Sequence, residues 1–195
     1  MRNVATAARP CLNMATRAGA VYRPAMMDIA PASFAGTTYH ATIEANVPGT
    51  PADLPAYLDH ALAHTLETGG RFNPPGTFGA VYLSLDAATP VHESDAPEVI
   101  LELDAQLSAV LDLHRPEALR KYGLSRDEVC GGDHGPCQRA GRAIRDDGYE
   151  AVRYPSAVGD GVNLAVFWDR RRPDSSLRLA GHLDARGRRG AGPAG

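Results

Sequence analysis

The sequence has few cysteines, one tryptophan and no long apolar run, and these shortages exclude several classes of protein. Three cysteines among 195 residues cannot form the dense, even-numbered disulfide framework of small secreted domains. No run of about 18 apolar residues occurs, so we expect no membrane-spanning helix. The N-terminal residues lack the long apolar segment of a secretory signal, and we therefore expect a cytoplasmic protein.

The charge of the chain is acidic overall but unevenly distributed. The net charge is −3; residues 170–195 carry seven arginines against two aspartates, or +5, which leaves −8 on residues 1–169. A body this acidic excludes nucleic-acid binding through a broad basic face. Because residues 170–195 lack aromatic residues and apolar periodicity, they predict a basic disordered tail. Binding of nucleic acid or of an acidic partner through this tail alone is the alternative.

Hydrophobic patterning predicts a domain in which strands outnumber helices. The expected strands combine β-branched and apolar residues and span 37–43, 79–85, 99–103, 109–113, 151–156 and 163–168. Several of them are adjacent in sequence, which favours a mixed sheet over a doubly wound parallel one. The predicted fold class is therefore α+β, with a single mixed-sheet domain at 36–169.

Two longer helices are predicted between the strands, together with a short helical turn that carries Glu93 and a short helix within 115–136, and both ends of the chain look irregular. Leucines recur at every fourth position of residues 52–67, and residues 138–147 run up to Gly148, which ends a helix. Residues 1–35 show no sustained period and are expected to form a poorly ordered N-terminal extension.

Four polar residues occupy positions suited to binding a nucleotide. Arg71 lies in a stiff Gly69-Gly-Arg-Phe-Asn-Pro-Pro-Gly loop, where a guanidinium can grip a phosphate. Tyr82 is central in an apolar strand, and its ring can stack on a flat heterocycle. Glu93 follows that strand, and Ser156 ends a later one after a proline. Each feature alone is more often packing or turn chemistry, so composition and period do not establish the function.

Read together, these segments resemble the RES domain, a family named for its arginine, glutamate and serine. The resemblance covers about residues 37–168. The motifs that carry it, in chain order, are Gly69-Gly-Arg-Phe-Asn-Pro-Pro-Gly-Thr, Ala80-Val-Tyr-Leu-Ser-Leu, Thr89-Pro-Val-His-Glu, Gly148-Tyr-Glu-Ala-Val, Tyr154-Pro-Ser-Ala and Asn163-Leu-Ala-Val-Phe. The resemblance implies a fold similar to ADP-ribosyltransferases, NAD+ as the substrate with no further cofactor, and, as in toxin members of the family, a helix-turn-helix antitoxin as partner.

The same resemblance implies roles for the candidate residues. Arg71 would hold the phosphates or ribose of NAD+, and Tyr82 would pack on the nicotinamide. Glu93 would orient the nicotinamide ribose and favour the oxocarbenium-like state, and Ser156 would contact the ribose or an incoming phosphate. Asn163, the first residue of the last motif, is expected among the residues that bind the nucleotide. Nicotinamide leaves as a neutral molecule from a cationic ring, so positioning and charge stabilisation suffice without a metal.

The sequence departs from the family pattern at two places. An arginine usually follows the tyrosine of the first strand, whereas this chain has Tyr39-His40, as in ADP-ribosyltransferases of the diphtheria-toxin type. His40 would then donate a hydrogen bond to the ribose. Pro97 shortens the helix expected after Glu93, and Glu98 is the alternative carboxylate.

The acceptor of the ADP-ribosyl group stays open at this point. Water would make the chain a glycohydrolase, inorganic phosphate a phosphorylase, and a protein side chain an ADP-ribosyltransferase. A nucleotide-binding module without turnover and an interaction protein that uses the arginine-rich tail are the two rival classes.

Two histidine- or cysteine-containing patterns suggest metals but are interpreted otherwise. Cys130, His134 and Cys137 supply three ligands in a glycine-rich segment with no clear fourth, so we expect an exposed loop with free thiols. His60 and His64 are one helical turn apart and fit the outer face of a leucine-lined helix. No metal site is predicted.

Overall fold

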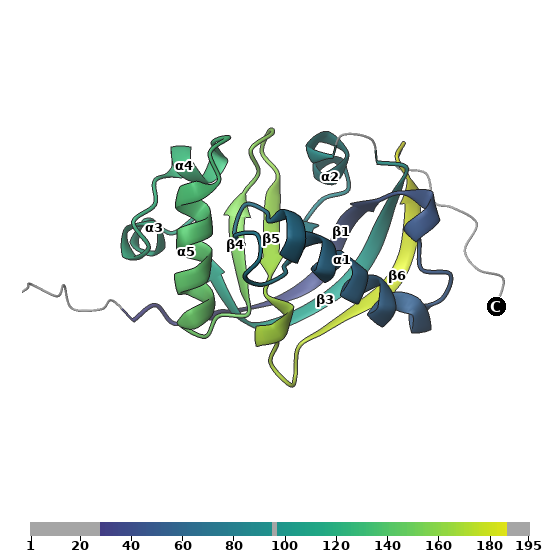
Figure 1. Ribbon diagram of the computed structural model, residues 1–195, viewed down its shortest axis with the longest axis horizontal. Coiled ribbons are helices and arrows are strands. Elements are labelled where there is room, and N and C mark those ends of the chain that lie inside the picture. Colours follow the sequence, from purple (N-terminus) through teal and green to yellow (C-terminus); the bar gives the residue numbers. More distant parts are fainter. Residues whose placement is uncertain (1–27, 95–96, 187–195) are drawn as a thin grey trace, which may run out of the picture.

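A six-stranded sheet organises the part of the chain that the structure, a computed structural model, describes, namely residues 28–94 and 97–186 (Figure 1). The strands are β1 Ala32–Thr42, β2 Val81–Ser84, β3 Val99–Asp112, β4 Ala151–Pro155, β5 Val162–Val166 and β6 Ser176–Asp184. The α-helices are α1 Leu54–Thr68, α2 Ala88–Glu93, α3 Pro116–Lys121, α4 Arg126–Cys130 and α5 Gly135–Asp146. Three 3-10 turns complete this part: η1 Glu44–Asn46, η2 Pro51–Asp53 and η3 Trp168–Arg170.

The sheet closes on itself through its first strand. Its order is β1-β2-β5-β4-β3-β6, and β1 also pairs with β3, so five strands form a ring and β6 extends it. The β3–β4 pairing is parallel and the other pairings are antiparallel. The predicted single α+β domain with a mixed sheet is confirmed, whereas its likeness to ADP-ribosyltransferases stays a prediction.

One apolar cluster packs α5 against the sheet. The buried side chains Cys137, Ala140 and Ile144 recur at helical spacing and meet the fully buried Phe72 and Phe167. Burial of such a large side chain contributes roughly 1.5–3 kcal/mol to stability. Helices α3, α4 and α5 gather at this end of the molecule (Figure 1).

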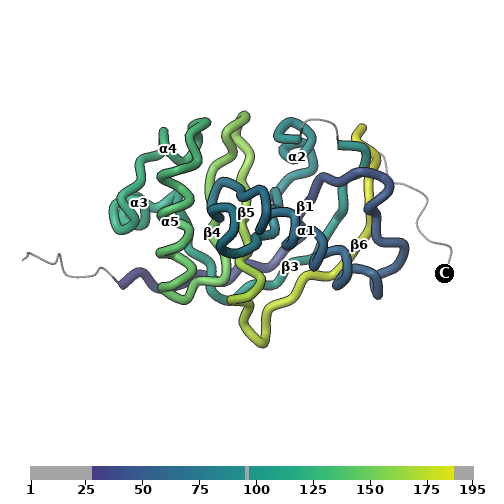
Figure 2. Tube along the Cα trace, viewed as in Figure 1, coloured from purple at the N-terminus to yellow at the C-terminus, as the bar shows by residue number. Residues whose placement is uncertain are grey.

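A second cluster packs the start of α1 against the other part of the sheet. Leu54, Tyr57 and Leu58 are buried, Leu62 is half-buried, and Leu66 is 40% exposed. The predicted stripe of inward leucines therefore ends before the last turn of the helix. That turn instead leads into the loop that follows α1, which Figure 2 traces alongside β5.

The structure corrects three predicted boundaries. β6 lies within the segment expected to be a disordered tail, and its residues 176–184 pair with β3 from Val99 to Gln106. The prediction of disorder is therefore wrong for this strand. β1 likewise begins inside the extension expected at 1–35, and the segment 109–113 continues β3 rather than forming a strand of its own. The rest of both ends, 1–27 and 187–195, lies outside the described residues.

A buried carboxylate ties β6 to the rest of the sheet. Glu150 is fully buried and accepts hydrogen bonds from the Ala109 and Arg172 amides and from Ser175 Oγ, each at 2.8 Å. It also accepts from the Ser108 amide. These donors come from β3 and from the turn before β6, so one side chain fixes where the last strand starts.

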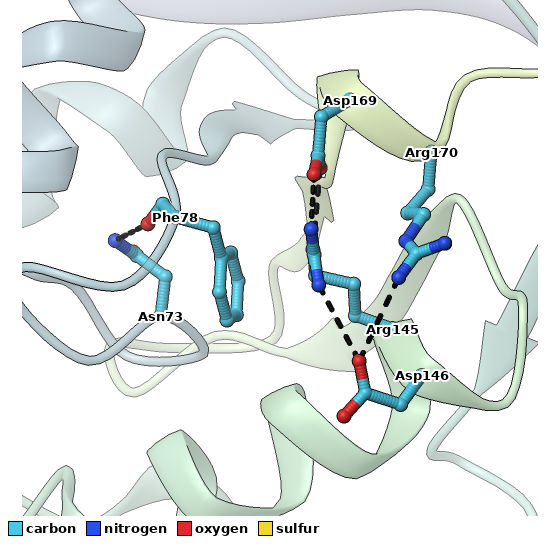
Figure 3. Close-up of polar contacts among 6 residues, drawn as sticks. All are labelled: Asn73, Phe78, Arg145, Asp146, Asp169 and Arg170. Carbon is cyan, nitrogen blue, oxygen red and sulfur yellow. Dashed lines mark hydrogen bonds and ion pairs between the residues drawn. The ribbon is translucent and has the colours of Figure 1, made fainter.

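The loop after α1 is held from both sides. Asn73 Nδ2 donates to the Phe78 carbonyl at 2.9 Å, which closes the loop on itself. The Arg145 guanidinium of α5 lies 4.8 Å from the centroid of the Phe78 ring and pairs with Asp169 of η3 (Figure 3). A cation placed over an aromatic face is stabilising, so α5 and η3 together support this loop.

Candidate active site

The loop after α1 forms one wall of a cleft of about 510 Å³. The other walls come from β1, β2, α2 and the β4–β5 connection. Five of the six residues predicted to bind or cleave the nucleotide line this cleft: His40, Arg71, Tyr82, Glu93 and Asn163. The volume lies within the range of sites that enclose small molecules. The residues predicted from the sequence thus come together at one place in the fold.

Glu93, the last residue of α2, is oriented by two buried side chains. Asn163 Nδ2 donates to Glu93 Oε1 at 2.9 Å and to Oε2 at 3.0 Å, and Ser156 Oγ donates to Oε1 at 2.5 Å. Asn163 and Ser156 are only 2% and 4% exposed, so packing fixes both donors. The carboxylate is consequently held in one orientation at the cleft surface. The alternative carboxylate, Glu98, instead accepts the Glu44 amide at 2.7 Å.

Ser156 is the one predicted residue that does not line the cleft. Its hydroxyl donates to Glu93 and accepts the Val158 amide at 3.0 Å. The predicted contact with the ribose or a phosphate is therefore not what this geometry supports. Ser156 contacts the carboxylate from the protein side, which suits it to position Glu93.

Ser84, which the sequence analysis did not select, completes the network. Its Oγ donates to Asn163 Oδ1 at 2.7 Å, which turns the amide nitrogen of Asn163 toward Glu93. Alternation along β2 could have indicated it, because Tyr82 and Ser84 are two residues apart and so share a face of the strand.

Arg71 is half-buried and held by backbone carbonyls. Its Nη1 donates to the carbonyls of Val129 and Gly131, both at 2.7 Å. From α5, Gln138 Nε2 donates to the Gly70 carbonyl at 3.0 Å. The guanidinium is therefore fixed in direction while it lines the cleft, which suits it to an anion such as a phosphate.

Tyr82 lies along the cleft, but its hydroxyl is already committed to the loop after α1. It donates to Asn73 Oδ1 and accepts the Phe72 amide, both at 2.8 Å. Gly70 covers the ring so closely that a Cβ there would lie 2.5 Å from the hydroxyl oxygen. Burial raises the pKa of Tyr82, so it stays protonated. Tyr82 thus joins β2 to the loop that carries Arg71.

His40 reaches the cleft from β1 with a defined tautomer. Its Nδ1 lies 2.6 Å from the Tyr82 carbonyl oxygen, which can only accept, so the proton is assigned to Nδ1. Burial lowers the pKa of His40, which favours the neutral ring. Nε2 is then an acceptor. The neutral ring thus offers the cleft an acceptor rather than the donor that the sequence predicted.

The cysteines of the described residues are buried or half-buried rather than displayed on an exposed loop. Cys137 lies inside α5, and burial raises its pKa to about 11, so its thiol is a poor nucleophile. Cys130 is half-buried. Within 28–94 and 97–186, no group of three or more His, Cys, Asp or Glu side chains could hold a metal ion. In the same residues no helix has the length and apolarity that crossing a bilayer requires.

The structure thus defines an α+β protein with a mixed sheet and one cleft, around which a guanidinium, an oriented carboxylate and a histidine come together. The RES domain model matches residues 50–185, and the chain belongs to this family. The family resemblance inferred from the motifs is confirmed. The match also reaches past residue 169 and includes β6.

Named relatives come from mycobacteria. The chain is 34% identical over 131 residues to the NAD(+) phosphorylase MbcT of Mycobacterium tuberculosis H37Rv and of Mycobacterium bovis, a match that covers 60% of this chain and 70% of each relative. The crystal structure of the M. tuberculosis MbcT–MbcA toxin–antitoxin complex superposes with a TM-score of 0.61 at 25% identity. That superposition covers 79% of this chain and 86% of the other.

Proposed function

We propose that this chain is an NAD+ phosphorylase, which breaks the nicotinamide–ribose bond of NAD+ and transfers the ADP-ribosyl group to inorganic phosphate. The observation that carries the proposal is Glu93, a cleft carboxylate fixed by Asn163 and Ser156. The relatives that are named NAD(+) phosphorylases support phosphate as the acceptor.

The chemistry needs no group beyond the substrates and these side chains. As the bond between ribose C1 and the nicotinamide nitrogen breaks, its electron pair neutralises the ring and positive charge moves onto the ribose. The Glu93 carboxylate stabilises that charge, because a preorganised negative group is most effective where charge develops. A phosphate oxygen then bonds to C1. The products are nicotinamide and ADP-ribose 1-phosphate.

The other cleft residues fit supporting roles. Arg71, fixed by two carbonyls, anchors the pyrophosphate of NAD+. His40 Nε2 accepts a hydrogen bond from a ribose hydroxyl. The Tyr82 ring, which lies next to Gly70 in the cleft wall, packs against the nicotinamide. It contributes packing and does not transfer a proton.

The test is nicotinamide release by purified protein, measured with and without inorganic phosphate, with ³¹P spectroscopy of the sugar product. The proposal predicts phosphate-dependent release and a new phosphate ester signal, both lost in Glu93→Gln and Arg71→Ala. His182→Gln, on β6 outside the cleft, is the matched control and keeps full activity. Nicotinamide release at the same rate with and without phosphate would make the chain a glycohydrolase. Transfer of the ADP-ribosyl group to a protein would make it an ADP-ribosyltransferase.

We also propose that the activity is toxic and is neutralised by a partner protein in the cytoplasm. The support is the related structure, which is a toxin–antitoxin complex. The family resemblance suggests a helix-turn-helix protein as the partner. Induced expression of the wild type is expected to arrest growth and deplete NAD+, whereas Glu93→Gln does neither. Growth arrest by Glu93→Gln would show that toxicity does not depend on NAD+ cleavage.

A further inference from the structure

More histidines lie around the cleft than the proposed reaction uses. The chain has seven histidines. Five of them line the cleft or the pocket that continues it: His40, His60, His64, His92 and His134. The two others, His114 and His182, line neither.

The continuing pocket has a volume of about 380 Å³ and lies between α1 and the end of β1. His40 and His64 border both spaces, so the two are continuous. Its walls are mainly apolar, with Ile43 and Tyr57 among them. His60 and His64 of α1 are the ionisable side chains at its mouth that are exposed to solvent, and they are one helical turn apart.

Two imidazoles at this spacing suit an anion better than a metal. No cluster with the ligands for a metal ion occurs among the described residues. Protonated imidazoles donate charge-assisted hydrogen bonds to phosphate oxygens, and histidine gains its proton close to neutral pH. Arg71 lines the cleft and is already fixed there by two backbone carbonyls. A second phosphate in the site would need other donors.

Other charged groups around the pair lie at its rim. Asp59 and Glu67 are on α1 itself and are exposed. Glu98 accepts a hydrogen bond from the Glu44 amide. Both residues adjoin the pocket wall in sequence, since Glu98 follows Pro97 and Glu44 follows Ile43. Glu93 faces the cleft, bound to Asn163. In this acidic surrounding, an anion is favoured only when the imidazoles carry protons.

We propose that His60 and His64 form a phosphate subsite that binds its anion in the protonated state. On the proposed function, the phosphate is the inorganic acceptor, held beside the ribose end of NAD+. A phosphate group carried by the nucleotide has the same chemistry and is the second possible source. The activity would then depend on pH through substrate binding, separately from the chemical step.

The test compares the double variant His60→Gln/His64→Gln with the wild type and with the control His114→Gln/His182→Gln. At about pH 6 the KM for phosphate is expected to rise about tenfold in the double variant, and at about pH 8 by less than about twofold, since neutral imidazole and glutamine then donate similarly. The kcat and the KM for NAD+ stay unchanged. A rise confined to the KM for NAD+ would assign the subsite to a nucleotide phosphate.

A measurement without turnover separates this inference from the proposed function. Histidine signals are followed by NMR in a pH titration of the wild type, with and without inorganic phosphate. Phosphate is expected to move the titration midpoints of His60 and His64 to higher pH, but not those of His114 and His182. Such shifts in a protein that releases no nicotinamide would retain the subsite and reject the proposed function. Unchanged titrations together with an unchanged KM for phosphate would overturn the subsite.

Discussion

Replacement of Asn163 by leucine tests whether the orientation of Glu93 limits catalysis. Leucine has the same branching and number of side-chain heavy atoms and leaves the buried position filled, but it removes both hydrogen bonds to the Glu93 carboxylate. Ser156 alone would then hold Glu93, and the side chain gains rotational freedom at the cleft surface. The substitution therefore changes the carboxylate's direction without removing its charge.

The magnitude follows from those two bonds. A hydrogen bond to a charged group contributes about 1.5–3 kcal/mol, and the lower end applies here because Glu93 is exposed and water competes for it. Two bonds at about 1.5 kcal/mol each total about 3 kcal/mol, which corresponds to a kcat lower by roughly 150-fold. Nicotinamide release at saturating NAD+ and phosphate measures this, and the KM for NAD+ is expected to change by less than about threefold.

The variants form an ordered series that can refute the reasoning. Glu93→Gln sets the maximal loss, Asn163→Leu and Ser156→Ala follow, and Ser84→Ala, which acts only through Asn163, loses least. The double variant Ser156→Ala/Asn163→Leu is expected to fall no further than Glu93→Gln, because both residues act through one carboxylate. Wild-type kcat in Asn163→Leu, or an effect on KM alone, would show that Glu93 needs no fixed direction.

Three further predictions concern stability and pH. Gly70→Ala is expected to lower the free energy of unfolding, measured by urea denaturation, by about 1–3 kcal/mol, because its Cβ would collide with Tyr82. Gly132→Ala, with no atom within 4 Å of the added carbon, should leave that free energy unchanged. Glu150→Gln is expected to cost about 2–4 kcal/mol in the same assay, because a buried amide cannot accept all the bonds that the carboxylate accepts. Burial lowers the pKa of His40, so the unfolded chain binds its proton first and stability falls as pH drops below about 6.5. His40→Gln should reduce the loss of stability between about pH 7 and about pH 5, and equal losses in both proteins would contradict this.

Local chemistry explains what could be predicted from the sequence. The prolines and glycines around Arg71 fix a loop whatever surrounds it, and β2 and β5 are short, mainly apolar runs that begin within two residues after a glycine. These features depend on neighbours in sequence. The meeting of Arg71, Tyr82 and Glu93 at one cleft does not, and it was expected only because the motifs together resemble the RES domain.

The features that were missed depend on contacts across the fold. In β6, Leu179 pairs with Leu103 but Gly181 pairs with Glu102, so Ala180 is an extra residue that interrupts alternation, and the arginine content concealed the strand. Ser156 was expected at the substrate, but its partner is Glu93, a contact between positions 63 residues apart. Neither a bulge nor such a contact leaves a periodic pattern in the sequence.

The cleft carboxylate is completed late in the order of synthesis. Glu93 emerges from the ribosome well before β5, which supplies Asn163, and β1 waits for β3 before it has its main partner. A chain whose translation stops before residue 163 has no amide to orient the carboxylate and no β5 to bridge β2 and β4. Fragments that end before residue 163 would therefore leave cellular NAD+ untouched.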